Sequence, residues 1–162
     1  MRKGQFATTL AIHACPENLV GEVEQLIQTF GLSPLWVKQE LVNGSQRCEL
    51  ALKISEDQVE ELASALYAIG AVYFEINQRQ GKFGLLFMGV PGLGVYRGEL
   101  NEAGSILLSE DRINQMIAQG AGNQREFMRL LRVALGQSWD DLIEPFRGAR
   151  YSDNVVLLNR AG

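Results

Sequence analysis

The fold is decided by residues 8–77, which open with TTLAIHACPENLVGEVEQLIQTFG at residues 8–31 and continue with LWVKQELVNGSQRCELALKI at residues 35–54. This stretch contains one pattern twice: a strand, then an amphipathic helix, then another strand. Alternating apolar and polar side chains indicate strands, and apolar side chains that recur every three or four residues indicate helices. The predicted strands are residues 8–15, 35–42, 47–54 and 71–77, and the predicted helices are residues 16–30 and 57–69.

Both predicted helices have recognisable ends. Pro16 suits the first turn of the first helix, because its missing N–H would be unpaired there, and Gly31 is a natural C-terminal cap. Ser55 and Gln58 have the spacing of a capping box at the start of the second helix, and Gly70 ends it. Each helix carries one apolar stripe that folding has to bury. The stripes are Leu19, Val23, Leu26, Ile27 and Phe30 in the first helix and Val59, Leu62, Ala63, Leu66 and Ile69 in the second.

The predicted order βαββαβ favours a two-layer α+β domain. Asn43-Gly44 favours a tight hairpin turn, which requires positive φ, and the strands beside it have one apolar and one mostly polar face. Right-handed crossovers would then place both helices on one face of a single antiparallel sheet. We expect a ferredoxin-like unit over residues 1–80. Many small regulatory, metal-carrying and RNA-binding domains have this shape, so the fold selects no function.

Residues 81–162 predict additional strands, a hairpin and a C-terminal helical tail, packed into the same single domain. The glycine-rich residues 89–94 do not match a phosphate-binding loop, because a strand rather than a helix N-terminus follows them. Turns are the simpler interpretation. The predicted elements are strands at residues 82–90, 95–101 and 105–108, helices starting at Ser109, Asn123 and Ser138, the last of them ending near Pro145, and a possible final strand at residues 155–158.

The composition excludes several classes of protein. A chain of 162 residues with 46% hydrophobic and 21% charged residues can bury a core. Its net charge of −4 argues against nucleic-acid binding, which needs a basic face. The longest apolar run, residues 85–90, is too short to cross a membrane. The spacing of Cys15 and Cys48, on predicted adjacent strands, permits a disulfide as the alternative, but no secretory signal precedes them, so we expect reduced, buried thiols in a cytoplasmic protein.

Several segments resemble an actinobacterial family, the domain of unknown function 3145, and the resemblance covers nearly the whole chain. It is carried by residues 6–7, 12–16, 62–66 and 72–75 and, more densely, by residues 93–98, 110–113 and 135–147. The resemblance implies a cytoplasmic protein of actinobacterial metabolism, and it brings no activity, cofactor or catalytic residue. Members of the family carry a histidine before their Leu-Gly stretch, where this chain has Val90-Pro91. Chemistry that used such a histidine is therefore absent here or located elsewhere.

Three residues suggest a ligand site in the sheet. His13 is the sole histidine of the chain and lies where the first strand ends, at an edge where a titrating imidazole could move protons. Tyr96 and Arg97 follow the glycine-rich turn, and an arginine there could hold a small acidic ligand through its carboxylate or phosphate. The alternative interpretations are a histidine that anchors a strand–helix corner and an arginine on the surface of a strand.

A second candidate site lies on the last predicted helix. Asp140 and Glu144 are four residues apart and share a face, and paired carboxylates can bind Mg²⁺ or share a proton. They also fit helix capping, because acidic side chains near an N-terminus favour the helix dipole. Trp139 is expected to pack the tail helix onto the sheet, with an exposed partner contact as the alternative.

Two functions fit these patterns. The first is a non-enzymatic binding, assembly or regulatory module that acts on a protein partner or forms a homodimer, without cofactor or metal. Capping and packing explain most of the sequence, and no acid, base and nucleophile converge. The alternative is a small enzyme with a site near His13, Tyr96 and Arg97, which requires these side chains to meet in one cleft.

Overall fold

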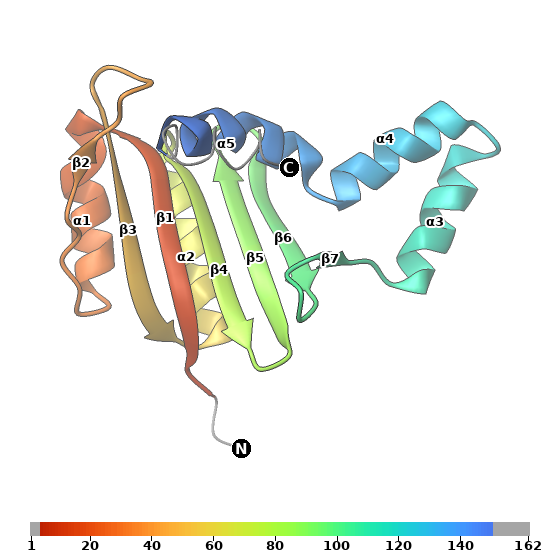
Figure 1. Cartoon of the computed structure of the whole chain (residues 1–162), viewed down its shortest axis with the longest axis horizontal. Coiled ribbons are helices and arrows are strands. Elements are labelled where there is room, and N and C mark those ends of the chain that lie inside the picture. Colours follow the sequence, from red (N-terminus) through yellow and green to blue (C-terminus); the bar gives the residue numbers. More distant parts are fainter. Residues whose placement is uncertain (1–3, 151–162) are drawn as a thin grey trace, which may run out of the picture.

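A seven-stranded antiparallel sheet organises the chain in the computed structural model, which describes residues 4–150 (Figure 1). Its strands are β1 (Phe6–Pro16), β2 (Val37–Lys38), β3 (Ser45–Ile54), β4 (Tyr73–Gln80), β5 (Phe83–Val90), β6 (Gly94–Leu100) and β7 (Ile106–Leu107). They lie in the order β2-β3-β1-β4-β5-β6-β7. The first four strands have the order expected of the βαββαβ unit, and the later ones extend the sheet from β4 as a meander.

Two helices, α1 (Val20–Gln28) and α2 (Glu56–Ile69), cover one face of the sheet, as predicted. Val23 of α1 and Leu62 of α2 pack in the same core as Phe74 of β4. The capping box at the start of α2 is present, because the Gln58 N–H donates to Ser55 Oγ and the Ser55 N–H donates to Gln58 Oε1. Burial of the two stripes therefore holds the helices on this face.

The first helix begins later than predicted. Pro16 belongs to β1, where it pairs with Ser45, and a 3₁₀ turn at Glu17–Leu19 precedes α1. The Glu17 N–H donates to the Gly44 carbonyl at 2.9 Å. This contact with the turn before β3 and the pairing of Pro16 with Ser45 keep Pro16 in the sheet, so the helical turns begin only at Glu17.

The β2–β3 hairpin is shorter than predicted. The turn at Asn43-Gly44 forms, with Gly44 at φ +77° and the Ser45 N–H donating to the Val42 carbonyl. However, β2 contains only Val37–Lys38 instead of residues 35–42. The side chain of Gln39 explains the early end, because it donates to the His13 carbonyl and accepts from the Leu41 N–H.

A third layer lies on the other face of the sheet, so the two-layer prediction was incomplete. Helix α5 (Gln137–Arg150) packs there, with Ile143 buried against Met88 and Tyr96 (Figure 1). The prediction that this helix ends near Pro145 was wrong. Pro145 leaves the carbonyl of Asp141 without a helical donor, but Asp141 is exposed, so water can satisfy this carbonyl. Burial of Ile143 and Phe146 on either side of the proline favours continuation of the helix.

Helices α3 (Glu110–Gly120) and α4 (Gln124–Ala134) pack against each other and project beyond the β7 edge of the sheet (Figure 1). We call this pair the arm. Ser109 and Asn123 cap the two helices, as predicted, through hydrogen bonds from the backbones of Arg112 and Glu126. The possible strand at residues 155–158 lies outside the described residues. None of the described helices is long and apolar enough to cross a membrane.

Candidate functional site

The candidate site begins at an irregularity in β1. The register of β1 shifts between Ile12 and Cys15 against β3, and between Ile12 and Ala14 against β4, so His13 is the extra residue of a β-bulge. A bulge breaks the alternation of faces and re-aims a side chain. The Gln39 side chain fixes this one, because its Nε2 donates to the His13 carbonyl at 2.7 Å.

The imidazole of His13 forms a buried pair with a carboxylate. His13 is 3% exposed, and its Nε2 lies 3.0 Å from Oε1 of Glu75 on β4. Arg147 of α5 approaches the same oxygen, with Nη2 at 3.1 Å. Burial by itself would raise the pKa of Glu75, but the hydrogen bond to His13 and the charge of Arg147 outweigh it and hold that pKa below its ordinary value. Glu75 is therefore a carboxylate at neutral pH.

Arg147 binds the two acidic residues that the sequence singled out on the tail helix. Its Nη1 lies 2.7 Å from Oδ1 of Asp140 and 2.8 Å from Oε2 of Glu144. Burial opposes the charge of Arg147, but Glu75 and these two carboxylates raise its pKa. Asp140 and Glu144 thus hold an arginine between α5 and the sheet. Three carboxylates share one guanidinium, so a small acidic ligand would have to displace one of them.

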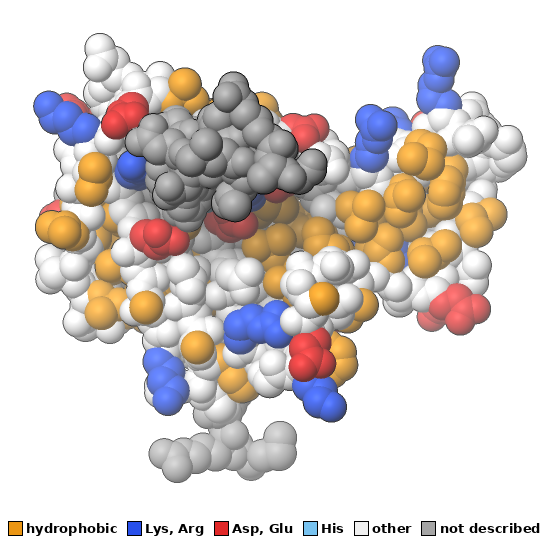
Figure 2. Space-filling model, in the orientation of Figure 1, with side chains coloured by type: hydrophobic (Ala, Val, Ile, Leu, Met, Phe, Trp, Pro, Cys, Tyr) orange, Lys and Arg blue, Asp and Glu red, His pale blue; other side chains and the backbone are white. Residues whose placement is uncertain are grey.

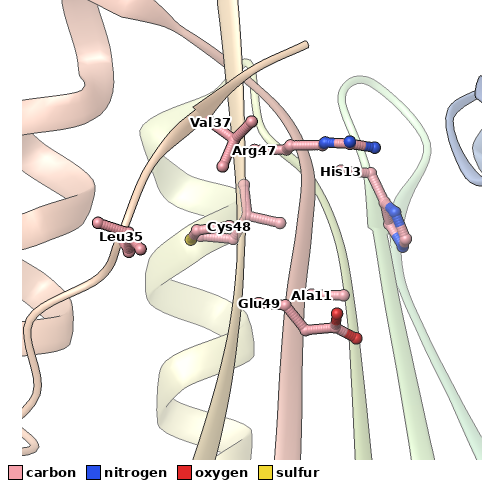
Figure 3. A pocket seen from close by; sticks show the side chains of 8 residues that line it. Ala11, His13, Leu35, Val37, Arg47, Cys48 and Glu49 are labelled. Carbon is pink, nitrogen blue, oxygen red and sulfur yellow. The ribbon is translucent and has the colours of Figure 1, made fainter. Parts of the chain in front are cut away.

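Two cavities meet at His13 on the face of the sheet that α5 covers. One, of about 260 Å³, lies toward α5 and is lined by polar side chains that include Thr9, Asn77 and Arg147. The other, of about 200 Å³, lies toward the β2 edge and is lined by Leu35, Val37 and Arg47, among others (Figure 3). Ala11, His13 and Glu49 line both. Among the described residues, no group of three histidine, cysteine or acidic side chains could hold a metal ion.

Tyr96 and Trp139 form a separate cluster that anchors the base of the arm. Their rings lie 5.4 Å apart between centroids. The Tyr96 hydroxyl donates to the Ala134 carbonyl at 2.8 Å, and Trp139 Nε1 donates to the Gly94 carbonyl at 3.1 Å. Burial raises the pKa of Tyr96. Trp139 thus packs the tail helix onto the sheet, as expected, and Tyr96 joins the end of α4 to β6.

Arg97 lies away from both clusters. It follows Tyr96 in β6, so its side chain is on the opposite face of the sheet. There it pairs with Glu56 and Glu60 of α2, at 3.1 and 3.3 Å. The cleft that was expected to gather His13, Tyr96 and Arg97 is therefore not formed, because the sheet separates Arg97 from the other two.

Comparison with known proteins places the chain in a family. Residues 9–160 match the family described as "Protein of unknown function (DUF3145)". The chain belongs to this family. A search of curated proteins and a search of solved structures each found no match. The family description of this DUF3145 protein assigns no activity, so its chemistry has to be inferred from the geometry of its side chains.

Sequence reasoning missed Glu75 and Arg147, the two residues that assemble the candidate site of this DUF3145 protein. Asp140, Glu144 and Arg147 lie at helical spacing, which would have placed the arginine beside both acids. The signal was lost because the helix was expected to end near Pro145. Glu75 gave no such signal, because its partners are 62 and 72 residues away along the chain.

Proposed function

We propose that this protein is a non-enzymatic binding module that holds a partner protein on the arm formed by α3 and α4. Its setting in this proposal is the cytoplasm of an actinobacterium, where it would assemble or regulate a metabolic protein. The observation that carries the proposal is the exposed apolar surface of the arm, which the rest of the described chain does not cover.

The arm presents apolar side chains to solvent on more than one side. Ile117 of α3 is 55% exposed, and Met128 and Val133 of α4 are each 40% exposed. A hollow of about 350 Å³ between the two helices is lined in part by Ile117 and Phe127. Figure 2 shows hydrophobic side chains gathered over this part of the molecule. An exposed apolar surface on a projecting element is typical of a protein-binding site.

Arginines border this surface and indicate the chemistry of the partner. Arg125, Arg129 and Arg132 lie along α4 and line a groove of about 350 Å³ together with Met128 and Val133. Arg129 is paired with Glu126, whereas no described acidic side chain within residues 4–147 forms an ion pair with Arg125 or Arg132. We call this the basic groove. It fits a segment that presents acidic side chains beside apolar ones, because complementary charge selects partners and speeds association.

The cluster around His13 supports a structural role better than the enzyme alternative. His13, Glu75 and Arg147 are bound to one another, and Arg147 is also bound to Asp140 and Glu144. The cluster holds α5 on the sheet and so positions the arm, which is connected to α5. The enzyme alternative requires His13, Tyr96 and Arg97 to meet in one cleft, whereas Arg97 pairs with α2 on the opposite face of the sheet.

Affinity purification from the native host tests the proposal. The double variant Arg125→Glu/Arg132→Glu reverses the charge of the basic groove, and Lys53→Glu/Lys82→Glu makes the same charge change on exposed residues of β3 and the β4–β5 turn. We expect one protein to be recovered in near-equal amount with the wild type and the lysine variant, and to be lost with the arginine variant. Recovery that does not change with the arginine variant would overturn the proposal.

A further inference from the structure

The β2 edge of the sheet is open, short and apolar. Leu35 is 83% exposed, and Val37, Leu41 and Val42 are also exposed. β2 itself contains two residues and has β3 as its only neighbour within the described sheet. A strand at a sheet edge offers unpaired N–H and C=O groups to another chain, and this edge carries the exposed Leu35 and Val37 beside the charged Lys38.

The strand at this edge is shorter in the structure than the sequence pattern predicts. Alternation predicts a strand over residues 35–42, whereas the structure has Val37–Lys38. After Gln39, whose N–H donates to the Ser45 carbonyl, residues 40–42 leave the ladder and rejoin β3 through the turn at Asn43-Gly44. The strand pattern thus extends beyond the pairing that β3 supplies.

We propose that this edge pairs with the same edge of a second copy of the chain, antiparallel and with the two-fold axis at Gln39. This symmetry places Lys38 opposite Glu40 of the second copy, and Glu40 opposite its Lys38. It also places Val37 opposite Leu41, and Trp36 opposite Val42. Every cross-strand pair next to the axis then joins opposite charges or two apolar side chains, which is the self-complementarity that a two-fold interface requires.

The direction of the backbone agrees with this register. The Gln39 N–H points to β3, and backbone groups alternate along an extended strand, so those of Lys38 point to the open side. Pairing with the second copy extends the strand through Glu40 in exchange for the Leu41 N–H contact with Gln39 Oε1. Lys38 and Glu40 then become a hydrogen-bonded pair across the axis. A register centred on Lys38 would instead place the two lysines opposite each other.

The cavity beside the edge supplies space for the second copy. Leu35 and Val37 line the cavity of about 200 Å³ that reaches His13 and Arg47 (Figure 3). Val37 and Leu41 share a strand face, so in the proposed register Leu41 of the second copy covers Val37 at the mouth of this cavity. The interface thereby removes exposed leucine and valine surface of both chains from water.

Charge reversal tests the register with the full-length protein. Sedimentation equilibrium should show a dimer for the wild type. Lys38→Glu places four glutamates around the axis and Glu40→Lys places four lysines there, so each variant alone should dimerise more weakly, by about tenfold or more. An equimolar mixture of the two should restore the dimer, because the new glutamate at position 38 of one chain then faces the new lysine at position 40 of the other. The double variant Lys38→Glu/Glu40→Lys should restore it as well.

The proposal is overturned by a wild type that stays monomeric, or by single variants that dimerise as well as the wild type. Both substituted side chains are exposed, so circular dichroism should show an unchanged fold. This dimer is independent of the function proposed for the arm. Arg125→Glu/Arg132→Glu should leave the dimer intact, and Lys38→Glu should leave partner recovery by the arm unchanged, so each proposal can fail without the other.

Discussion

Arg147 on α5 and Glu75 on β4 form an ion pair, with Nη2 3.1 Å from Oε1. The pair joins the tail helix to the sheet face opposite α1 and α2. His13 binds the same carboxylate oxygen from the bulge in β1. Three segments that are distant in the sequence therefore meet at one carboxylate.

Removal of Arg147 should destabilise the protein. Arg147→Met leaves Glu75 largely buried without its cation, and we expect the free energy of unfolding to fall by about 2 kcal/mol. Urea unfolding followed by circular dichroism measures it. The control is Arg129→Met, which breaks an exposed pair with Glu126 and should cause no measurable change. Equal effects of the two variants would contradict the role of Arg147.

Glu75 should make stability depend on acid pH. Its pKa in the folded protein lies below the ordinary value of 4.5. As the pH falls through 4.5, the unfolded chain takes up a proton at this carboxyl before the folded chain does, so the free energy of unfolding decreases. The decrease ends once the pH is below the folded pKa. Above 4.5 this contribution is complete.

Urea unfolding of Glu75→Gln between neutral pH and pH 3 should therefore show a shallower loss of stability on acidification than the wild type. The variant should also be less stable at neutral pH, because the amide loses the charged contact with Arg147. A variant whose stability falls as steeply with acid as that of the wild type would show that Glu75 does not carry this dependence.

The sequence predicts the first four strands and both helices beneath them because the signals there are local. Ser55 and Gln58 lie three residues apart, Gly70 ends α2, and Asn43-Gly44 contains its own turn. These features depend on neighbours along the chain. Alternation and capping rules act over the same range, so they predict such features well.

The parts that could not be predicted depend on contacts between distant segments. The bulge at His13 cannot be recognised from the sequence of β1, because it is defined by the register of β1 against β3 and β4. α5 continues past Pro145 because Ile143 and Phe146 are buried, although proline favours a helix end. The Glu75–Arg147 pair joins β4 to the part of α5 beyond Pro145, across 72 residues of sequence, which is why it was not predicted.

Gly89 should not tolerate a side chain. It lies opposite Phe74 in the β4–β5 ladder, and a Cβ at Gly89 would approach Phe74 Cε1 to 2.0 Å. Phe74 is fully buried in the main core. We expect Gly89→Ala to lower the free energy of unfolding by about 3 kcal/mol, the upper range for overpacking.

Gly21 provides the matched control for Gly89. It lies in α1 with no atom within 4 Å of an added Cβ, so Gly21→Ala should raise the free energy of unfolding by about 0.5 to 1 kcal/mol. Urea unfolding of the two variants should thus give opposite signs. A neutral Gly89→Ala would show that Phe74 does not lie over this position.

The two cysteines should be unreactive in the folded protein. Burial raises the pKa of Cys15 to about 11 and that of Cys48 to about 12, in each case with a smaller contribution from nearby negative charge. Both are buried free thiols. At pH 8 a thiol reagent should label neither in native buffer and both in urea, because only the thiolate reacts. Rapid labelling of the native protein would contradict their burial.

Site-specific photo-crosslinking in the native host tests whether the arm binds a partner protein. A photoreactive amino acid is placed at Met128 in the basic groove or, as a control, at Lys53 on β3. We predict one discrete crosslinked product from position 128, none from position 53, and loss of the product when Arg125→Glu/Arg132→Glu is added. No product from position 128, or a product that persists with both arginines reversed, would contradict the claim.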